Sequence, residues 1–183
     1  MLTVEKKKKY TIDDYMQLEE GAPFQLINND LIMSPSPNPF HQFIVVRLSK
    51  VMLNFLEDKE MGGYIAGSVD VVFDDGNVFQ PDLLYVAEER VAELVKGRIE
   101  GAPDIAIEIL SPSNAYYDLI QKKEMYEKYG VKEYIIFDPI AKNASLYVLK
   151  DGAYYLHQKA QQNELLHSVV LAGFDFDLNY LFK

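Results

Sequence analysis

The chain of 183 residues contains no cysteine. Disulfide bonds and thiolate metal sites are therefore excluded, and the composition is compatible with a reducing compartment. Residues 1–10 carry four consecutive lysines at positions 6–9 with no apolar region after them, so a secretory signal is not indicated. No apolar run is long enough to span a bilayer. We expect a cytoplasmic protein without a membrane segment, whose residues 1–9 form a flexible N-terminal segment.

Positive charge is also scarce. Eighteen Lys and Arg residues face 28 Asp and Glu residues, which gives a net charge of −10. Broad, non-specific binding of nucleic acid depends on Lys and Arg against phosphates, so the charge argues against it. A nuclease is not excluded, because its acidic residues can hold a divalent metal in a local cleft. The length and the 49% hydrophobic content predict one globular domain over residues 1–183.

The most informative stretch is residues 104–110, in which an apolar run follows Asp104 and has one acid, Glu108, in its middle. This pattern predicts a central strand that is covered on both faces. Glu108 is therefore expected to be buried, where an ionised carboxylate is unfavourable unless a cation or metal compensates it. A Ser/Asn turn at residues 111–114 then starts a predicted helix over residues 115–129, which Gly130 ends in the left-handed conformation.

On this predicted helix, one stripe of side chains faces the sheet. Its members are Leu119, Lys122, Met125, Tyr126 and Tyr129. A lysine inside such a stripe needs an acidic partner, and Glu108 on the preceding strand is the obvious one. Taken alone, the lysine could extend its head group to water and the acid could sit at the end of the sheet. The two together, on consecutive elements, favour a site.

The rest of the chain alternates between predicted strands and helices. We predict helices at residues 11–20, 39–59 and 88–96, hairpins at 24–33 and 145–157, and strands at 64–66, 69–73, 79–86, 133–138 and 165–171, with an edge segment at 174–178. This order predicts an α/β (α+β) fold in which a central mixed β-sheet is flanked by helices.

Two further polar residues, Asp82 and His41, lie in apolar parts of the sequence. Asp82 follows Pro81 at the beginning of an apolar run, and so repeats the isolated acid seen at Glu108. His41 falls in the first turn of the predicted helix over residues 39–59, on its apolar face. A lone histidine there is more often a satisfied helix-start residue than a functional one.

Asp82, Glu108 and Lys122 together form a candidate catalytic constellation. Two converging carboxylates suit Mg²⁺ or Mn²⁺, with waters completing the coordination. Such a metal polarises a phosphoryl oxygen and lowers the pKa of its bound water. The lysine could orient or deprotonate that water, or stabilise charge on the transferring phosphate.

Several motifs occur in an order that resembles a known family. They are Gln25-Leu26-Ile27, Ser34-Pro35, His41-Gln42, Pro81-Asp82, Glu108-Ile109-Leu110-Ser111-Pro112-Ser113, Asp118 to Lys122, Tyr126, and Gly130-Val131-Lys132-Glu133-Tyr134. From about Tyr10 to Phe182 the chain resembles the Uma2 family (DUF820), a domain of the PD-(D/E)XK restriction-endonuclease-like superfamily.

The resemblance implies a restriction-endonuclease-like core and a Mg²⁺-dependent (or Mn²⁺-dependent) endonuclease acting on DNA. Asp82 and Glu108 would be catalytic metal ligands, and the Ile109 backbone carbonyl a further ligand. Lys122 would be the motif lysine, supplied by the helix, which agrees with its place in the stripe. A homodimer is expected, because a small acidic domain needs more surface to hold a duplex.

Supporting roles fall to Gln25, His41, Asp118 and Tyr126. Relatives usually carry a glutamate where this chain has Gln25, and glutamine brings no negative charge to a cation. Asp118 precedes Lys122 by four residues and could pair with it along the helix. Tyr126 is more simply explained by core packing, because aromatic stripes are usually buried in cores.

Three hypotheses remain open at this stage. The first is the metal-dependent DNA endonuclease. The second is a catalytically weak or inactive nuclease-fold domain with a binding or regulatory role, which Gln25 and the acidic charge would explain. In the third, Glu108 and Lys122 form a buried ion pair that is structural only.

Overall fold

The computed structural model describes residues 8–19, 21–34, 37–111 and 117–183, and in the last range the side chains from residue 120 onward. Within these residues no helix has the length and apolar character needed to cross a membrane. The helices are α1 (Ile12–Tyr15), α2 (Pro39–Asp58), α3 (Glu88–Leu94), the π-helical segment η1 (Tyr117–Lys122), α4 (Lys123–Tyr129) and α5 (Leu178–Leu181).

Thirteen strands are present in the described residues. They are β1 (Phe24–Ile27), β2 (Asp30–Met33), β3 (Tyr64–Ala66), β4 (Val71–Asp74), β5 (Asn77–Phe79), β6 (Leu83–Val86), β7 (Ile99–Glu100), β8 (Ile105–Ile109), β9 (Glu133–Asp138), β10 (Asn143–Lys150), β11 (Ala153–Gln161), β12 (Leu165–His167) and β13 (Asp175–Asp177). Asn28 and Asn29 both adopt positive φ in the β1–β2 turn, as a two-residue hairpin of this type requires.

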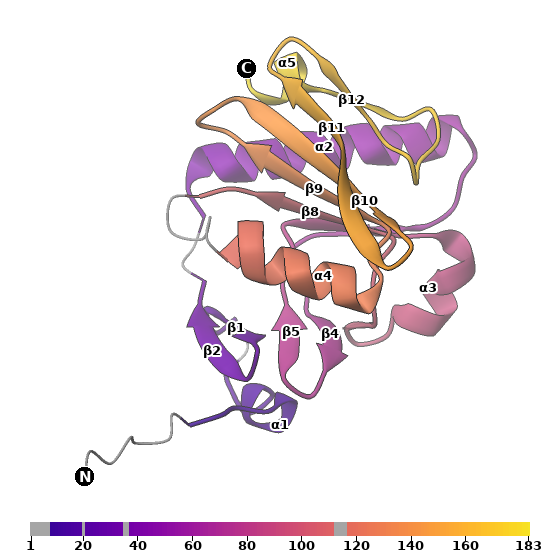
Figure 1. The fold of residues 1–183 in the computed structure, drawn as a ribbon. Coiled ribbons are helices and arrows are strands. Elements are labelled where there is room, and N and C mark those ends of the chain that lie inside the picture. The colour runs from indigo at the N-terminus through magenta and orange to yellow at the C-terminus, as the bar shows by residue number, and fades with distance from the viewer. Residues whose placement is uncertain (1–7, 20, 35–36, 112–116) are drawn as a thin grey trace.

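The strands form two main sheets (Figure 1). The larger sheet has the order β11-β10-β9-β8-β6-β3, in which β8 and β9 are parallel and the other neighbours antiparallel. The smaller sheet has the order β2-β1-β5-β4-β7, and β12 pairs with β13 separately. The predicted α+β fold with a central mixed sheet flanked by helices is therefore confirmed.

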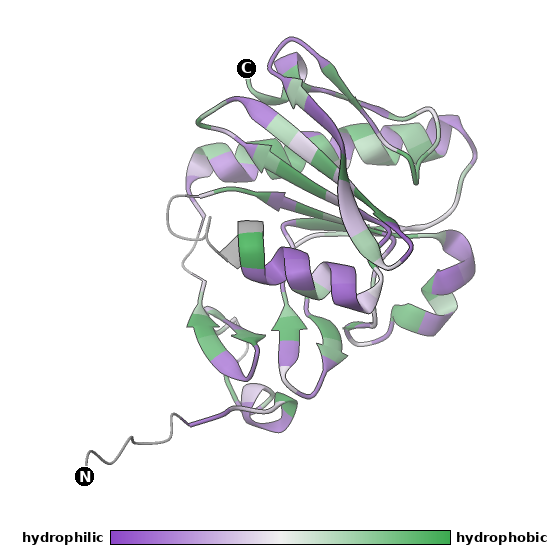
Figure 2. Cartoon of the chain, viewed as in Figure 1, coloured by the Kyte–Doolittle hydropathy of each residue, from purple (hydrophilic) through white to green (hydrophobic). Residues whose placement is uncertain are grey.

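The two faces of β8 are buried against different helices. Ile105, Ile107 and Ile109 belong to the core that includes the buried side of α2, whereas Ala106 packs in a second cluster with Tyr126 of α4. The whole strand is buried, as its apolar run predicts. In Figure 2 the central strands are largely hydrophobic, while α4 contains many hydrophilic residues. Glu108 thus lies on the α4 face of a fully buried strand.

The single strand predicted over residues 79–86 is wrong. Strand β5 ends at Phe79 in the smaller sheet and β6 begins at Leu83 in the larger one. Pro81 lies in the interruption, because it has no N–H for a strand ladder and holds the preceding residue extended. The chain therefore passes from one sheet to the other here, and Asp82 comes to lie at the beginning of β6.

Other predicted boundaries also shift. The first helix ends at Tyr15 instead of continuing to residue 20. The predicted helix over residues 115–129 is divided between η1 and α4, and residues 112–116, including the predicted Ser/Asn helix start, lie outside the described part of the chain. The predicted strand over residues 165–171 is only β12, because turns follow it.

Candidate functional site

The candidate site lies at the end of β8, where β6 begins. The two strands are antiparallel, with Leu83 opposite Ile107 and Tyr85 opposite Ile105. Continuing this register by one residue places Asp82 opposite Glu108. The break at Pro81 and the antiparallel pairing thus bring together two acids that are 26 positions apart in the sequence.

Two groups hold the Asp82 carboxylate at this edge. The backbone N–H of Ile109 donates to Oδ2 at 2.7 Å, and the His41 imidazole contacts the same oxygen through Nε2 at 3.0 Å. His41 is placed by the start of α2, where the Asn38 side chain accepts the His41 N–H at 2.9 Å. No described residue bonds to Oδ1 of Asp82, whose side chain is 20% exposed. This oxygen is therefore accessible to a ligand.

Glu108 is paired as the sequence predicts. Lys122 Nζ donates to Oε1 of Glu108 at 2.9 Å, and the Tyr126 hydroxyl donates to the same oxygen at 2.7 Å. All three side chains are buried, with Glu108 only 2% exposed. A buried carboxylate is tolerable here because it accepts hydrogen bonds from a cation and a hydroxyl.

The helix that follows supplies both donors. Lys122 is the last residue of η1, and Tyr126 lies four residues later on α4, so both side chains project from the same side. Single π-helical turns are frequently found at functional sites. Gly130 ends α4 with φ +86°, as predicted. The side chain of Asp118 lies outside the described part of the structure, so its predicted pairing with Lys122 stays a prediction.

Tyr126 has a polar contact that core packing alone does not predict. Its ring packs among Phe73, Phe79 and Tyr134, as expected of a core aromatic, yet its hydroxyl reaches Glu108. The spacing of four residues from Lys122 is the sequence signal that could have revealed this contact.

Gln25 is held close to the same edge. Its Oε1 accepts the backbone N–H of Gln80 at 2.9 Å, two residues before Asp82. The Gln80 side chain in turn donates to Asp70 Oδ1 at 2.9 Å, and the Tyr15 hydroxyl donates to the same oxygen at 2.9 Å. Asp70, Tyr15 and Gln80 were not predicted from the sequence, because they are far apart in the chain and match no motif.

The donor chemistry of this edge fits a hard divalent cation. In the described part of the chain no three His, Asp or Glu residues form a ready cluster for a metal. Mg²⁺ does not need such a cluster, because it is usually held by one or two carboxylates and retains several waters. Asp82, Glu108 and the backbone oxygen of Ile109 are oxygen donors of the required kind.

Two other buried acids have structural partners instead. Burial alone raises the pKa of Asp104, but hydrogen bonds from the Ala87 N–H, Lys132 and Arg90 outweigh it and leave the pKa below its ordinary value. Burial raises the pKa of Glu133, whose carboxylate accepts hydrogen bonds from the turn that follows β12. Its donors are the Ser168 hydroxyl and the N–H groups of Val169 and Val170.

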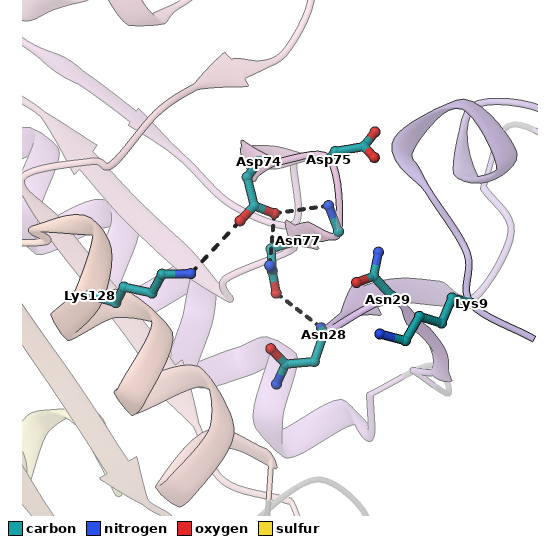
Figure 3. Close-up of a pocket in the computed structure, with 8 residues that line it drawn as sticks. Lys9, Asn28, Asn29, Asp74, Asp75, Asn77 and Lys128 are labelled. Carbon is teal, nitrogen blue, oxygen red and sulfur yellow. Dashed lines mark hydrogen bonds and ion pairs between the residues drawn. The ribbon is translucent and has the colours of Figure 1, made fainter. Parts of the chain in front are cut away.

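A polar pocket of about 560 Å³ lies elsewhere, between the β1–β2 and β4–β5 turns (Figure 3). Its lining residues are Lys9, Asn28, Asn29, Asp74, Asp75, Gly76, Asn77 and Lys128. Asp74 accepts hydrogen bonds from Gly76 and Asn77 within its own turn, and Asn77 accepts the N–H of Asn28. These contacts connect the two turns, and the pocket includes none of the predicted catalytic residues.

Comparisons with known proteins agree with the fold and the motifs. The family model of Uma2, described as "Putative restriction endonuclease", matches residues 12–179. An uncharacterized protein of Synechocystis sp. is 24% identical over 141 residues, which cover 75% of this chain and 80% of that protein. The crystal structure of a DUF820 protein from Anabaena variabilis, described as a putative nuclease, superposes with a TM-score of 0.77 at 21% identity, over 94% of this chain and 97% of that one. Since the family model spans nearly the whole chain, the protein belongs to the Uma2 family of restriction-endonuclease-like proteins.

Proposed function

We propose that this protein is a Mg²⁺-dependent (or Mn²⁺-dependent) endonuclease of the PD-(D/E)XK type that hydrolyses phosphodiester bonds in DNA. The observation that carries the proposal is the meeting of Asp82 and Glu108 at one sheet edge, with buried Lys122 bonded to Glu108. The description of the Uma2 family supports the same reaction class.

In this proposal Asp82, Glu108 and the Ile109 carbonyl hold the cation. When bound, the metal supplies Lewis acidity that polarises a phosphoryl oxygen and makes an adjacent water more acidic. Asp82 is already oriented for this role, because the Ile109 N–H and His41 both bind Oδ2. None of the described residues bonds to Oδ1, which is left for the cation.

Lys122 and Tyr126 act on Glu108. Both donate to Oε1, which fixes the carboxylate against the strand and lowers the energy of its charged form in a buried position. Lys122 also brings positive charge to the edge where a phosphate would lie, so it is suited to stabilise charge that develops during hydrolysis.

The direct test combines metal binding with cleavage. Calorimetric titration with Mg²⁺ or Mn²⁺ should show binding to the wild type and its loss in Asp82→Ala. Supercoiled and linear DNA should be cut only with the metal, and Glu108→Ala should abolish cleavage in a folded protein. Glu93→Ala, on the exposed surface of α3, is the matched control and should cut like the wild type. Unchanged cleavage by Glu108→Ala would refute the assignment.

A second candidate is a nuclease-fold domain that binds or regulates without cutting. The observation that favours it is Gln25, a neutral side chain whose oxygen is already bonded to Gln80. This candidate predicts no metal binding and no cleavage in the wild type. If Gln25→Glu then cuts DNA with metal, the missing charge is the cause of the inactivity.

The proposed assembly is a homodimer of single-domain subunits that act on one duplex. Sedimentation velocity of the wild type, with and without a duplex oligonucleotide, measures this directly. A monomer under both conditions would contradict it.

A further inference from the structure

The side-chain amide of Gln25 has a fixed orientation. It receives the backbone N–H of Gln80, and a backbone N–H can bond only to the oxygen of the amide. Oε1 therefore faces Gln80, and the amino group Nε2 must face the other way. Unlike most amide assignments, this one does not depend on a choice between two equivalent flips.

Nε2 of Gln25 is a donor that is available to a group from outside the protein. The residue is 5% exposed, and none of the described residues accepts a hydrogen bond from Nε2. Nε2 is not among the fully buried polar atoms that lack a hydrogen-bond partner, so it retains contact with solvent. An acceptor from outside the protein can therefore reach it.

The position of Gln25 on β1 shows where Nε2 lies. Side chains two residues apart point to the same face of a strand, so Gln25 shares its face with Ile27. Ile27 packs in the cluster that contains Phe79 and Tyr126, and Tyr126 bonds to Glu108. From the other side, Gln80 is two residues before Asp82. Gln25 therefore lies beside the edge that carries both candidate ligands.

The partner of Gln25 is itself immobilised. The Gln80 side chain donates to Asp70, which also accepts the Tyr15 hydroxyl, and the Tyr15 hydroxyl is within hydrogen-bond distance of Gln80. This network joins α1, the segment before β4 and the segment between β5 and β6. It holds the Gln80 backbone in place, and so it preorganises the direction in which Nε2 points.

We propose that Gln25 donates a hydrogen bond from Nε2 to a non-bridging phosphate oxygen of the nucleic acid, and that it contributes no ligand to the cation. This inference rests on the proposed function. An amino donor suits a phosphate, which carries only acceptors, and a neutral residue avoids adding a third negative charge to an edge that already holds two carboxylates. In this chain Gln25 is thus a substrate-positioning residue.

Metal affinity separates this role from metal ligation. Mg²⁺ and Mn²⁺ alone should bind Gln25→Leu within about twofold of the wild type, because the amide oxygen is not a ligand. A loss of tenfold or more would show that Oε1 leaves Gln80 and coordinates the cation, which would overturn the proposal. Far-UV circular dichroism and the thermal midpoint show whether each variant is folded.

Binding of the nucleic acid tests the donor itself. A fluorescent duplex oligonucleotide is titrated in Ca²⁺, a larger cation with a similar preference for oxygen ligands. Both Gln25→Leu and Gln25→Glu should bind about tenfold more weakly, as expected for one hydrogen bond to a charged group. Gln25→Glu retains an acceptor for the Gln80 N–H, so it tests the proposal even if Gln25→Leu fails to fold. Gln161→Ala, on the exposed edge strand β11, is the control and should bind normally.

The outcomes distinguish this inference from the proposed function. Equal binding by the wild type and both Gln25 variants would overturn the inference and leave the endonuclease proposal standing. No binding of the duplex by the wild type, in the presence of the cation, would refute the proposed substrate and the inference with it.

Discussion

At the scale of single residues, Tyr126 allows packing and polar contact to be separated. Tyr126→Phe keeps the ring among Phe73, Phe79 and Tyr134 but removes the hydroxyl that bonds to Glu108. We expect the free energy of unfolding to fall by about 1.5–3 kcal/mol, the usual value of a hydrogen bond to a charged group. Urea unfolding at pH 7 measures this. A fall in the free energy of unfolding of less than about 0.5 kcal/mol would mean that the Tyr126 hydroxyl does not stabilise the Glu108 carboxylate.

The contribution of the Glu108–Lys122 ion pair to stability can be separated by comparing a single variant with a double variant. Lys122→Met leaves a buried carboxylate without its cation, and breaking such a pair typically lowers stability by about 3–5 kcal/mol. The double variant with Glu108→Leu removes both charges and should recover most of that loss, since apolar replacements of buried pairs are often neutral. Comparing the single and double variants by urea unfolding gives the coupling energy. If the double variant is as unstable as Lys122→Met alone, the instability of Lys122→Met is not caused by leaving Glu108 without its cation.

The candidate contacts differ in how far they follow from the sequence. Glu108 and Lys122 were predicted to meet because they lie on consecutive elements, where a strand pattern and a helix stripe determine their faces. The contacts of Asp82 with His41 and of Gln25 with Gln80 join residues 41 and 55 positions apart. Periodicity describes which face a side chain occupies but not which distant element covers it, so these pairs required the structure.

At the scale of elements, the segment around Pro81 shows the same limit. Residues 79–86 have the composition of one strand, and Pro81 was predicted only to place Asp82 at the beginning of its apolar run. The chain instead leaves the smaller sheet after Phe79 and enters the larger one at Leu83. A local pattern cannot say that two halves of an apolar run belong to different sheets, although this change of sheet is what brings Asp82 opposite Glu108.

Asp104 organises the beginning of α3, and its effect should depend on pH. Ala87 at the N-cap of α3 has no side-chain cap, and the Asp104 carboxylate accepts the Ala87 N–H while it contacts Arg90 and Lys132. Its folded pKa is lower than the ordinary 3.8, so it contributes stability above that value, and the contribution is lost as the pH falls through the folded pKa. We expect Asp104→Asn to be less stable by about 2–3 kcal/mol at pH 7.

Urea unfolding of the wild type and Asp104→Asn between pH 7 and pH 3 tests this assignment. The difference between the two proteins should be constant near neutral pH and should narrow below about pH 4, because both side chains are then uncharged in the unfolded chain. Asp138→Asn is a useful control, since Asp138 lies at the end of β9 and caps only its own turn. A difference that stays constant down to pH 3 would assign the loss to shape or hydrogen bonding instead of charge.

At the scale of the whole molecule, the two main sheets share a hydrophobic cluster. Ile27 and Phe79 come from the smaller sheet, Ala106 and Tyr134 from the larger one, and Tyr126 of α4 packs between them. The candidate site lies at this junction, because Gln25 belongs to the smaller sheet and Glu108 to the larger. Its geometry therefore depends on the two sheets remaining together, which supports the proposal that the chain is one domain.

This arrangement predicts a single cooperative unfolding transition for the wild type. Tyrosine fluorescence and far-UV circular dichroism should report the same urea midpoint, as two-state unfolding requires. Phe79→Ala removes a fully buried ring from the shared cluster and should lower the free energy of unfolding by about 3–5 kcal/mol while the two probes still coincide. If the sheets were independent units, the variant would instead separate the two transitions, because only the smaller sheet would be weakened. Coincident midpoints in both proteins would show that the two sheets unfold as one unit. Binding of a metal or a duplex at their junction should then raise the stability of the entire chain.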